Sequence, residues 1–239
     1  MISVNVSRVR EAVRDGRTWR TGIFKTPVSG SVRIGRLGLE GDEQGDQKHH
    51  GGVDQAVYAY TTGNYAHWRQ ELRRDDLPHG QFGENLTLEG LDPEDGGIAE
   101  DAVCIGDVFR FGGGAPSGGS LGDHGGGAVL QVSAPRAPCA TLAMAMGDKE
   151  FVKAFLASGR IGFYLRVLQE GVVAAGDTVE RVSVDPARLS VREATNLMYF
   201  GRHDVAGAAR AAGVSALKAG WREKFAERAG GSRQHGKPR

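Results

Sequence analysis

The residues best suited to chemistry lie in one short, stiff segment, Ser133-Ala-Pro-Arg-Ala-Pro-Cys139. Its two prolines fix backbone φ angles and restrict the residues before them, so Arg136 and Cys139 project from a preset backbone. A guanidinium near a thiol favours the thiolate, which attacks electrophiles and ligates soft metals. The same spacing also fits an inert buried cysteine beside a proline-rich turn. The other cysteine, Cys104, lies in an alternating strand pattern typical of the core.

A second candidate segment, residues 37–54, combines acidic residues, histidine and glycine directly before a predicted strand. His50 precedes two glycines that let the backbone approach a ligand closely, so its imidazole could donate a proton or a hydrogen bond. The alternative is a solvated polar turn. The adjacent His49 and His50 point to different sides of an extended chain, and no second histidine–carboxylate cluster accompanies them, which argues against a zinc hydrolase.

Two further segments carry weaker signals. Gln81-Phe-Gly-Glu-Asn-Leu86 places two polar side chains between a glycine and an apolar residue, which more often marks a plain turn than a site. Residues 112–127 are rich in glycine, and we expect a flexible connection between two strands. A phosphate-binding glycine loop would need a helix immediately after it, whereas a strand pattern follows here.

The elements that must position these segments are mostly strands. Period-two alternation predicts strands at 2–6, 22–28, 31–34, 55–60, 103–111, 128–132 and 181–184, with a hairpin turn at 29–30. Helical spacing and capping residues predict helices at 64–74 and 148–157.

The sequence pattern changes from mostly strand-like to helical after Asp185-Pro186. Capping patterns at Ser190, Asp204 and Ser215 predict three short helices. We therefore expect a mainly β fold with α elements (α+β). Its predicted parts are a domain of residues 1–185, a three-helix C-terminal domain of residues 186–230 and a flexible tail of residues 231–239.

Composition limits the function classes. The formal net charge is only +1, so no global field favours nucleic acid or an anionic membrane surface. No apolar run approaches the roughly 20 residues that span a bilayer, and the N-terminus lacks the pattern of a secretory signal. Two cysteines make a disulfide scaffold implausible. We expect a cytoplasmic protein that binds neither nucleic acid nor a membrane.

Taken together, these segments resemble the MOSC-domain family, named for the molybdenum cofactor sulfurase C-terminal region, and closely its YiiM-like branch. The resemblance is carried by Gly38-Leu-Glu-Gly-Asp42, His50-Gly-Gly, Phe82-Gly-Glu-Asn-Leu86, Ile105-Gly-Asp-Val-Phe109, Gln131-Val-Ser-Ala-Pro-Arg-Ala-Pro-Cys139, Gly159-Arg-Ile-Gly-Phe163 and Ser190-Val-Arg-Glu-Ala194. It covers nearly the whole chain, and the segment ending at Cys139 is its most specific part. One departure is the glycine-rich stretch 112–127, which is longer than the tight hairpin expected of the branch.

The resemblance implies a β-barrel-like MOSC domain that holds a molybdenum cofactor, that is, molybdopterin with molybdenum. Cys139 would be the thiolate ligand of molybdenum, which suits a high-valent metal with soft ligands. Arg136 and Lys25 would neutralise the phosphate and oxo oxygens of the cofactor. His50 would lie near the metal and donate a proton to a leaving oxygen. Asn85 would hydrogen-bond to the pterin or the substrate.

The activity that the resemblance implies is the reduction of N-hydroxylated compounds, such as hydroxylamino purines, to amines, which is a detoxification. The chain has neither a cysteine cluster nor a dinucleotide-binding glycine fingerprint, so a separate flavin or iron–sulfur protein must supply electrons. The C-terminal helices could dock this redox partner or a second copy of the chain in a homodimer.

Two alternatives stay open at this point. The first is a molybdopterin-binding or sulfur-carrier module that uses Cys139 without reductive turnover. The second is a cysteine–histidine acyl-transfer enzyme, which would require Cys139 and His50 within hydrogen-bond reach and an oxyanion hole.

Overall fold

The computed structural model describes residues 1–45, 51–94, 96–113 and 127–231. The strands of its largest sheet are β1 (Ser3–Val6), β4 (Thr26–Pro27), β7 (Val57–Thr61), β8 (Leu86–Leu88), β9 (Val108–Phe111), β10 (Ala128–Pro135), β11 (Phe163–Gln169) and β13 (Val179–Ser183). They follow the order β13-β9-β10-β11-β7-β8-β1-β4. Neighbours are antiparallel except for the parallel pair β7 and β8, so the sheet is mixed.

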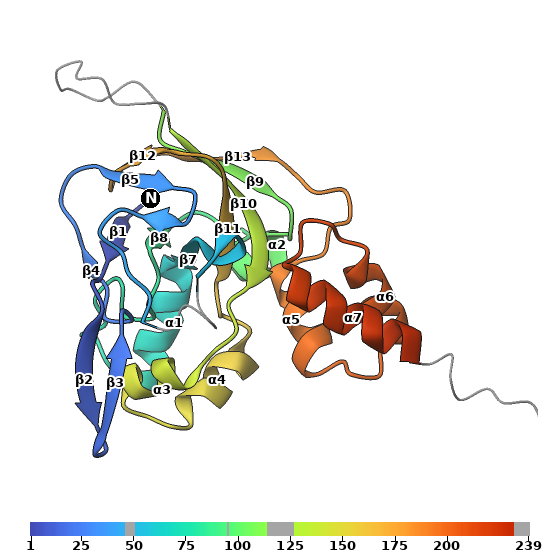
Figure 1. Cartoon of the computed structure of the whole chain (residues 1–239), viewed down its shortest axis with the longest axis horizontal. Helices are drawn as coiled ribbons and strands as arrows, with labels where there is room; N and C mark the ends of the chain where they lie inside the picture. Colours follow the sequence, from blue (N-terminus) through green and yellow to red (C-terminus); the bar gives the residue numbers. More distant parts are fainter. Residues whose placement is uncertain (46–50, 95, 114–126, 232–239) are drawn as a thin grey trace, which may run out of the picture.

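Two smaller sheets and the helices complete the fold (Figure 1). One sheet contains β5 (Val32–Gly35), β6 (Gly38–Leu39) and β12 (Gly171–Val173), and the other is a hairpin of β2 (Arg10–Arg14) and β3 (Arg17–Thr21). The helices are α1 (Thr62–Leu72), α2 (Ala99–Ala102), α3 (Ala140–Met146), α4 (Phe151–Ser158), α5 (Val191–Tyr199), α6 (Val205–Ala212) and α7 (Ala219–Gly231). A search of the described helices finds none whose length and apolar character would let it cross a bilayer.

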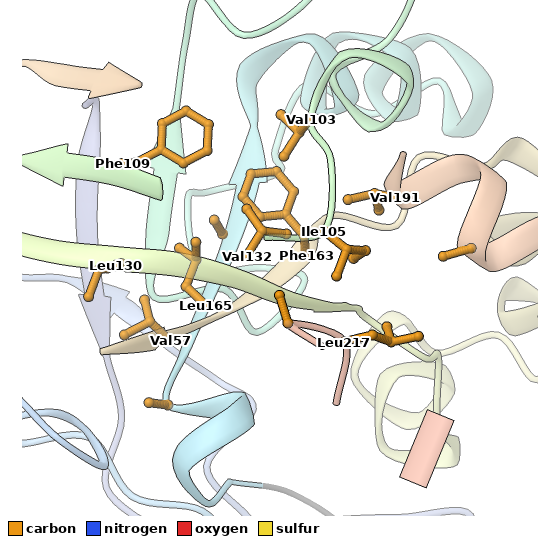
Figure 2. Packing of buried hydrophobic residues seen from close by; sticks show 14 of the residues in the cluster. Val57, Val103, Ile105, Phe109, Leu130, Val132, Phe163, Leu165, Val191 and Leu217 are labelled. Carbon is orange, nitrogen blue, oxygen red and sulfur yellow. The ribbon is translucent and has the colours of Figure 1, made fainter. Parts of the chain in front are cut away.

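One apolar cluster joins the two larger sheets to the C-terminal helices, which gather at one end of the molecule (Figure 1). Figure 2 shows Val132 of β10 and Ile105 next to Val191 of α5 and Leu217. Backbone hydrogen bonds cross the same boundary, because Val191 N–H donates to the carbonyl of Val103 over 2.9 Å. The chain therefore has the α+β architecture that the sequence predicts, with its helices packed onto a shared core.

A second cluster is mostly aromatic and lies between β7, α1 and α4. It contains Tyr58, Tyr60, Tyr65, Trp68, Leu77, Phe82, Leu142, Phe151, Phe155 and Ile161. These rings pack at tilted, edge-on and stacked angles, which are favourable arrangements for aromatic pairs. This cluster forms the wall against which the candidate site is built.

Several predicted boundaries are confirmed and others are wrong. The Ser190 hydroxyl accepts the N–H of Glu193 over 3.0 Å and caps α5, and Asp204 caps α6 in the same way. The predicted hairpin about residues 29–30 is wrong, because β4 pairs with β1 whereas β5 pairs with β12 and β6. The third C-terminal helix begins at Ala219 instead of after Ser215. The pairing of β9 with β10 confirms that residues 112–127 connect two strands, although 114–126 lie outside the described residues.

The hairpin β2–β3 and the helix α3 were not predicted from the sequence. The hairpin turns at Asp15-Gly16, where both residues have positive φ angles of 52° and 70°. An Asp-Gly pair is a strong signal for such a tight turn. The charged residues on both strands obscured the alternation that would have identified them.

Leu217→Ala tests whether the C-terminal helices share one core with the sheets. Leu217 is 1% exposed in the common cluster, so its truncation should lower the free energy of unfolding by about 2–5 kcal/mol. Unfolding in urea, followed by circular dichroism and tryptophan fluorescence, should remain one cooperative transition.

Leu37→Ala is the matched control, because Leu37 is 63% exposed and its loss should change stability by less than about 0.5 kcal/mol. Two separate transitions, with only the first one shifted by Leu217→Ala, would contradict the shared core. They would instead indicate an independently folding helical domain.

Candidate functional site

Four residues that the sequence analysis singled out line one pocket: Lys25, Asn85, Arg136 and Cys139. They come from the segment before β4, the turn before β8 and the connection between β10 and α3. The fifth residue, His50, lies outside the described residues. The tertiary structure therefore brings together side chains that are far apart in the sequence.

Arg136 and Cys139 belong to the short connection that joins the end of β10 to the start of α3. Cys139 precedes the first residue of α3 and is half-buried, whereas Cys104 is only 2% exposed in the core. The backbone N–H of Arg136 donates to the carbonyl of Gly162 over 3.2 Å. Its guanidinium carbon lies 5.5 Å from the ring centre of Tyr58 and 5.6 Å from that of Phe155.

Arg136 is a buried cation that the described residues do not neutralise. The residue is 4% exposed, and no carboxylate in the described chain forms an ion pair with its guanidinium. Its Nη1 atom is buried without a hydrogen-bond partner. Because an unpaired buried charge is costly, this guanidinium is the candidate anion-binding group of the pocket. The pocket thus combines a buried cation with a cysteine thiol.

Lys25, in contrast, is already neutralised by the protein. Its ammonium pairs with the carboxylate of Asp42, and both side chains are almost fully buried. Burial lowers the pKa of Lys25, and the neighbouring Asp42 acts in the opposite direction. Asp42 also accepts a hydrogen bond from the backbone N–H of Ser7 over 2.9 Å. Lys25 therefore contributes a donor to the pocket wall but little net charge.

Asn85 holds this charged pair in place. Its Nδ2 atom donates to a carboxylate oxygen of Asp42 over 2.9 Å and to the carbonyl of Asn5 over 3.3 Å. Its Oδ1 atom accepts the backbone N–H of Tyr58 over 3.1 Å. Both amide hydrogens are thus engaged within the protein. A hydrogen bond from Asn85 to a cofactor or substrate stays a prediction.

The pocket also has lining residues that the sequence analysis missed, notably Arg20, Tyr58 and Tyr164. The two tyrosine rings lie 5.5 Å apart, and the Tyr58 hydroxyl donates to the carbonyl of Ile161 over 2.9 Å. Burial raises the pKa of both phenols, so they stay protonated at neutral pH. Only the antiparallel pairing of β7 with β11 places them together, so no local pattern could have identified them.

Gly162 holds Arg136 in position by accepting its backbone N–H. It has a φ angle of +69°, and a side chain there would collide with the carbonyl of Ala59, so the position requires glycine. Its N–H donates to Oε1 of Glu100 over 2.7 Å, and the same oxygen accepts Nδ2 of Asn64 over 2.7 Å. Burial raises the pKa of Glu100 to about 7. The buried carboxyl group of Glu100 therefore holds the backbone of Gly162, and Gly162 in turn holds the backbone of Arg136.

The part of the chain that the structure describes contains no group of three or more His, Cys, Asp or Glu side chains that could hold a metal ion. Cys139 can offer one soft ligand, as thiolate. A metal bound at Cys139 would consequently need further ligands from outside the described residues, such as the sulfur atoms of a cofactor.

Comparisons with known proteins agree with this geometry. A family model described as MOSC domain matches residues 46–180. The uncharacterized protein YflK of Bacillus subtilis is 37% identical over 94% of this chain and 92% of its own length. A fungal protein named Reductase, from Gibberella moniliformis, is 30% identical over 75% of this chain, but the match spans only 28% of that protein. The crystal structure of YiiM from Geobacillus stearothermophilus superposes with a TM-score of 0.73 at 32% identity, covering 95% of this chain and 97% of that one.

Glu100→Gln tests the buried carboxyl group behind the site. Because the folded-state pKa of about 7 exceeds the ordinary value of 4.5, the folded protein binds this proton more tightly than the unfolded chain. The stability from this group is therefore present below pH 4.5 and is lost as the pH rises towards 7. The difference of 7 − 4.5 = 2.5 pH units corresponds to about 3 kcal/mol.

Urea unfolding of the wild type and of Glu100→Gln between pH 4.5 and 7.5 measures this effect. The wild type should lose up to about 3 kcal/mol relative to the variant over that range. Glu89→Gln, at an exposed position, is the control and should follow the wild type. Parallel pH profiles for the wild type and Glu100→Gln would show that Glu100 ionises normally.

Proposed function

This chain belongs to the MOSC domain family, and from that premise we propose that it is a molybdenum cofactor-dependent oxidoreductase. Its proposed reaction is the reduction of N-hydroxylated compounds, such as hydroxylamino purines, to amines. The observation that carries the proposal is a half-buried Cys139 in the same pocket as the buried, unneutralised Arg136. The name of one similar protein, the fungal reductase, supports the same class of activity.

The residues of the pocket fit the molybdenum cofactor. The Cys139 thiolate would ligate the metal, and the planar guanidinium of Arg136 would donate two parallel hydrogen bonds to phosphate or oxo oxygens. The Lys25–Asp42 pair, held by Asn85, would form a polar wall without adding a second net charge. When bound, the cofactor supplies a two-electron centre that can accept an oxygen atom.

The balanced reaction is R–NHOH + 2 e⁻ + 2 H⁺ → R–NH₂ + H₂O. The N–O bond breaks, and its oxygen leaves as water. His50 is the proposed proton donor, since an imidazole titrates near neutral pH. Tyr164 lines the pocket and stays protonated, so its hydroxyl can donate a hydrogen bond to a group bound there.

A separate protein is the proposed source of the two electrons. The chain contains only two cysteines, whereas an iron–sulfur cluster held by thiolates needs about four. We therefore propose a flavin or iron–sulfur protein as electron donor, in the cytoplasm. The detoxification of N-hydroxylated bases would be the physiological outcome.

Cys139→Ala tests the proposed function. In protein purified from a host that makes the cofactor, this variant should lose bound molybdenum and the reduction of N-hydroxyadenine by a reduced dye. Cys104→Ala is the matched control, because Cys104 is buried in the core and does not line the pocket, so molybdenum and turnover should persist. The measurements are elemental analysis and product quantification.

Full molybdenum content and turnover in Cys139→Ala would contradict the assignment of the metal ligand. Molybdenum without reductive turnover in the wild type, or sulfane sulfur on Cys139, would support a binding or sulfur-carrier module instead.

Arg136→Lys tests the anion-binding role of the guanidinium. The variant keeps the positive charge but loses the planar pair of donors, so it should retain the cofactor less well. Loss of one charge-assisted contact typically costs roughly 1.5–3 kcal/mol, or about ten- to a hundredfold in affinity. The measurement is molybdenum occupancy and its rate of loss during dialysis.

Arg33→Lys serves as control, because Arg33 pairs with Glu170 at an exposed position on β5. If Arg136→Lys retains molybdenum as well as the wild type does, the guanidinium does not bind the cofactor and only packs against the rings of Tyr58 and Phe155.

A further inference from the structure

A second and larger cavity adjoins the candidate site. It measures about 560 Å³, against about 100 Å³ for the pocket that Lys25 and Arg136 line. It lies between the hairpin β2–β3 on one side and the α3–α4 region on the other, and Cys139 lines both cavities. Its volume lies within the range of about 300–1,000 Å³ that is usual for small-molecule sites. A molecule in this second cavity would therefore lie next to the thiol.

The hairpin presents two arginines to this cavity. In its register Arg14 faces Arg17 directly, and Trp19 lies two residues further along on the same face of β3. Like charges directly opposite each other destabilise a hairpin. Neither arginine forms an ion pair with any residue that the structure describes, because the nearby Asp15 pairs with Lys149 instead. The hairpin thus places two exposed guanidiniums at the cavity, neither of them in an ion pair among the described residues.

Each guanidinium lies against another residue of the cavity wall. The Arg17 guanidinium lies over the ring of Trp19, 4.3 Å from its centre. The Arg14 guanidinium fills the space beside Gly147, where a side chain would collide with it. Two guanidiniums at one cavity can bind a dianion with several charge-assisted hydrogen bonds.

The rest of the cavity wall contains the charged residues Asp15, Asp148 and Lys149 together with apolar side chains. Half-buried Trp19, together with Pro138, Met144 and Val152, supplies aromatic and aliphatic surface. Such a surface suits a flat ring, and methionine adapts well to planar groups. The cavity therefore has a cationic part for an anion and an apolar part for a ring.

We propose that this cavity binds the substrate as a nucleoside monophosphate, with its phosphate at Arg14 and Arg17 and its base against Trp19 and Met144. The inference rests on the proposed function and narrows its substrate class to N-hydroxylated nucleotides instead of free bases. Cys139 borders the cavity, so a base bound there adjoins the proposed metal site.

Binding of unmodified nucleotides to the full-length protein tests this inference without any need for turnover. Adenosine 5′-monophosphate should bind, as measured by titration calorimetry, about tenfold or more tightly than adenosine or ribose 5-phosphate. Arg14→Gln and Arg17→Gln should each weaken nucleotide binding about tenfold or more and leave adenosine binding unchanged. Lys153→Gln is the control, because this exposed lysine of α4 does not line the cavity.

A thermal unfolding measurement separates a binding role from a structural one. Because both arginines are exposed, Arg14→Gln and Arg17→Gln should each melt within about 2 °C of the wild type. Equal affinity for adenosine and its monophosphate, absence of nucleotide binding at millimolar concentration, or unchanged binding in both arginine variants would overturn the inference.

Turnover distinguishes this inference from the proposed function. The KM for an N-hydroxylated adenosine monophosphate should be lower than that for N-hydroxyadenine, and Arg17→Gln should remove this difference. Equal KM values in the wild type would overturn the inference while the reductase function stands. Nucleotide binding at the arginines without any N-hydroxyl reduction would contradict the proposed function and support the binding site alone.

Discussion

The candidate site depends on one buried guanidinium that the described chain leaves without a carboxylate partner. Arg136 is held at its backbone by Gly162 and on its faces by aromatic rings, and neither contact neutralises its charge. Such a group is tolerated only where an anion can reach it or where cation–π contacts partly replace water. The aromatic cluster and the carboxyl group of Glu100 both serve to hold this cation at the pocket beside Cys139.

Two charged residues that line the same pocket as Arg136 form an ion pair with each other. Lys25 and Asp42 neutralise each other, and Asn85 uses its amide to fix the pair. Arg136 is therefore a buried cation of the pocket without a carboxylate partner among the described residues. The further arginines on the hairpin β2–β3 lie at the adjoining cavity, and Cys139 borders both cavities.

Packing explains why the chain needs its C-terminal helices close to this site. The connection that carries Arg136 and Cys139 follows β10, whose residues Leu130 and Val132 belong to the same cluster as Val191 and Leu217 (Figure 2). The Lys218 N–H donates to the carbonyl of Ser133 over 2.8 Å, three residues before Arg136. Close-packed interiors transmit small shifts, so the helices can influence how rigidly this connection is held.

The sequence by itself determined the local features of this protein, because they depend on neighbouring residues. Capping at Ser190 and Asp204, the alternating strands near residues 57 and 128, and the stiff segment ending at Cys139 follow from propensity and proline geometry. Lys25, Asn85 and Arg136 could be named only through a family resemblance or their spacing. Their meeting in one pocket, the neutralisation of Lys25 by Asp42, the pairing of Tyr58 with Tyr164 and the hairpin beside α3 were decided by tertiary structure. They depend on sheet order and on burial, and contacts between residues far apart along the chain leave no local pattern.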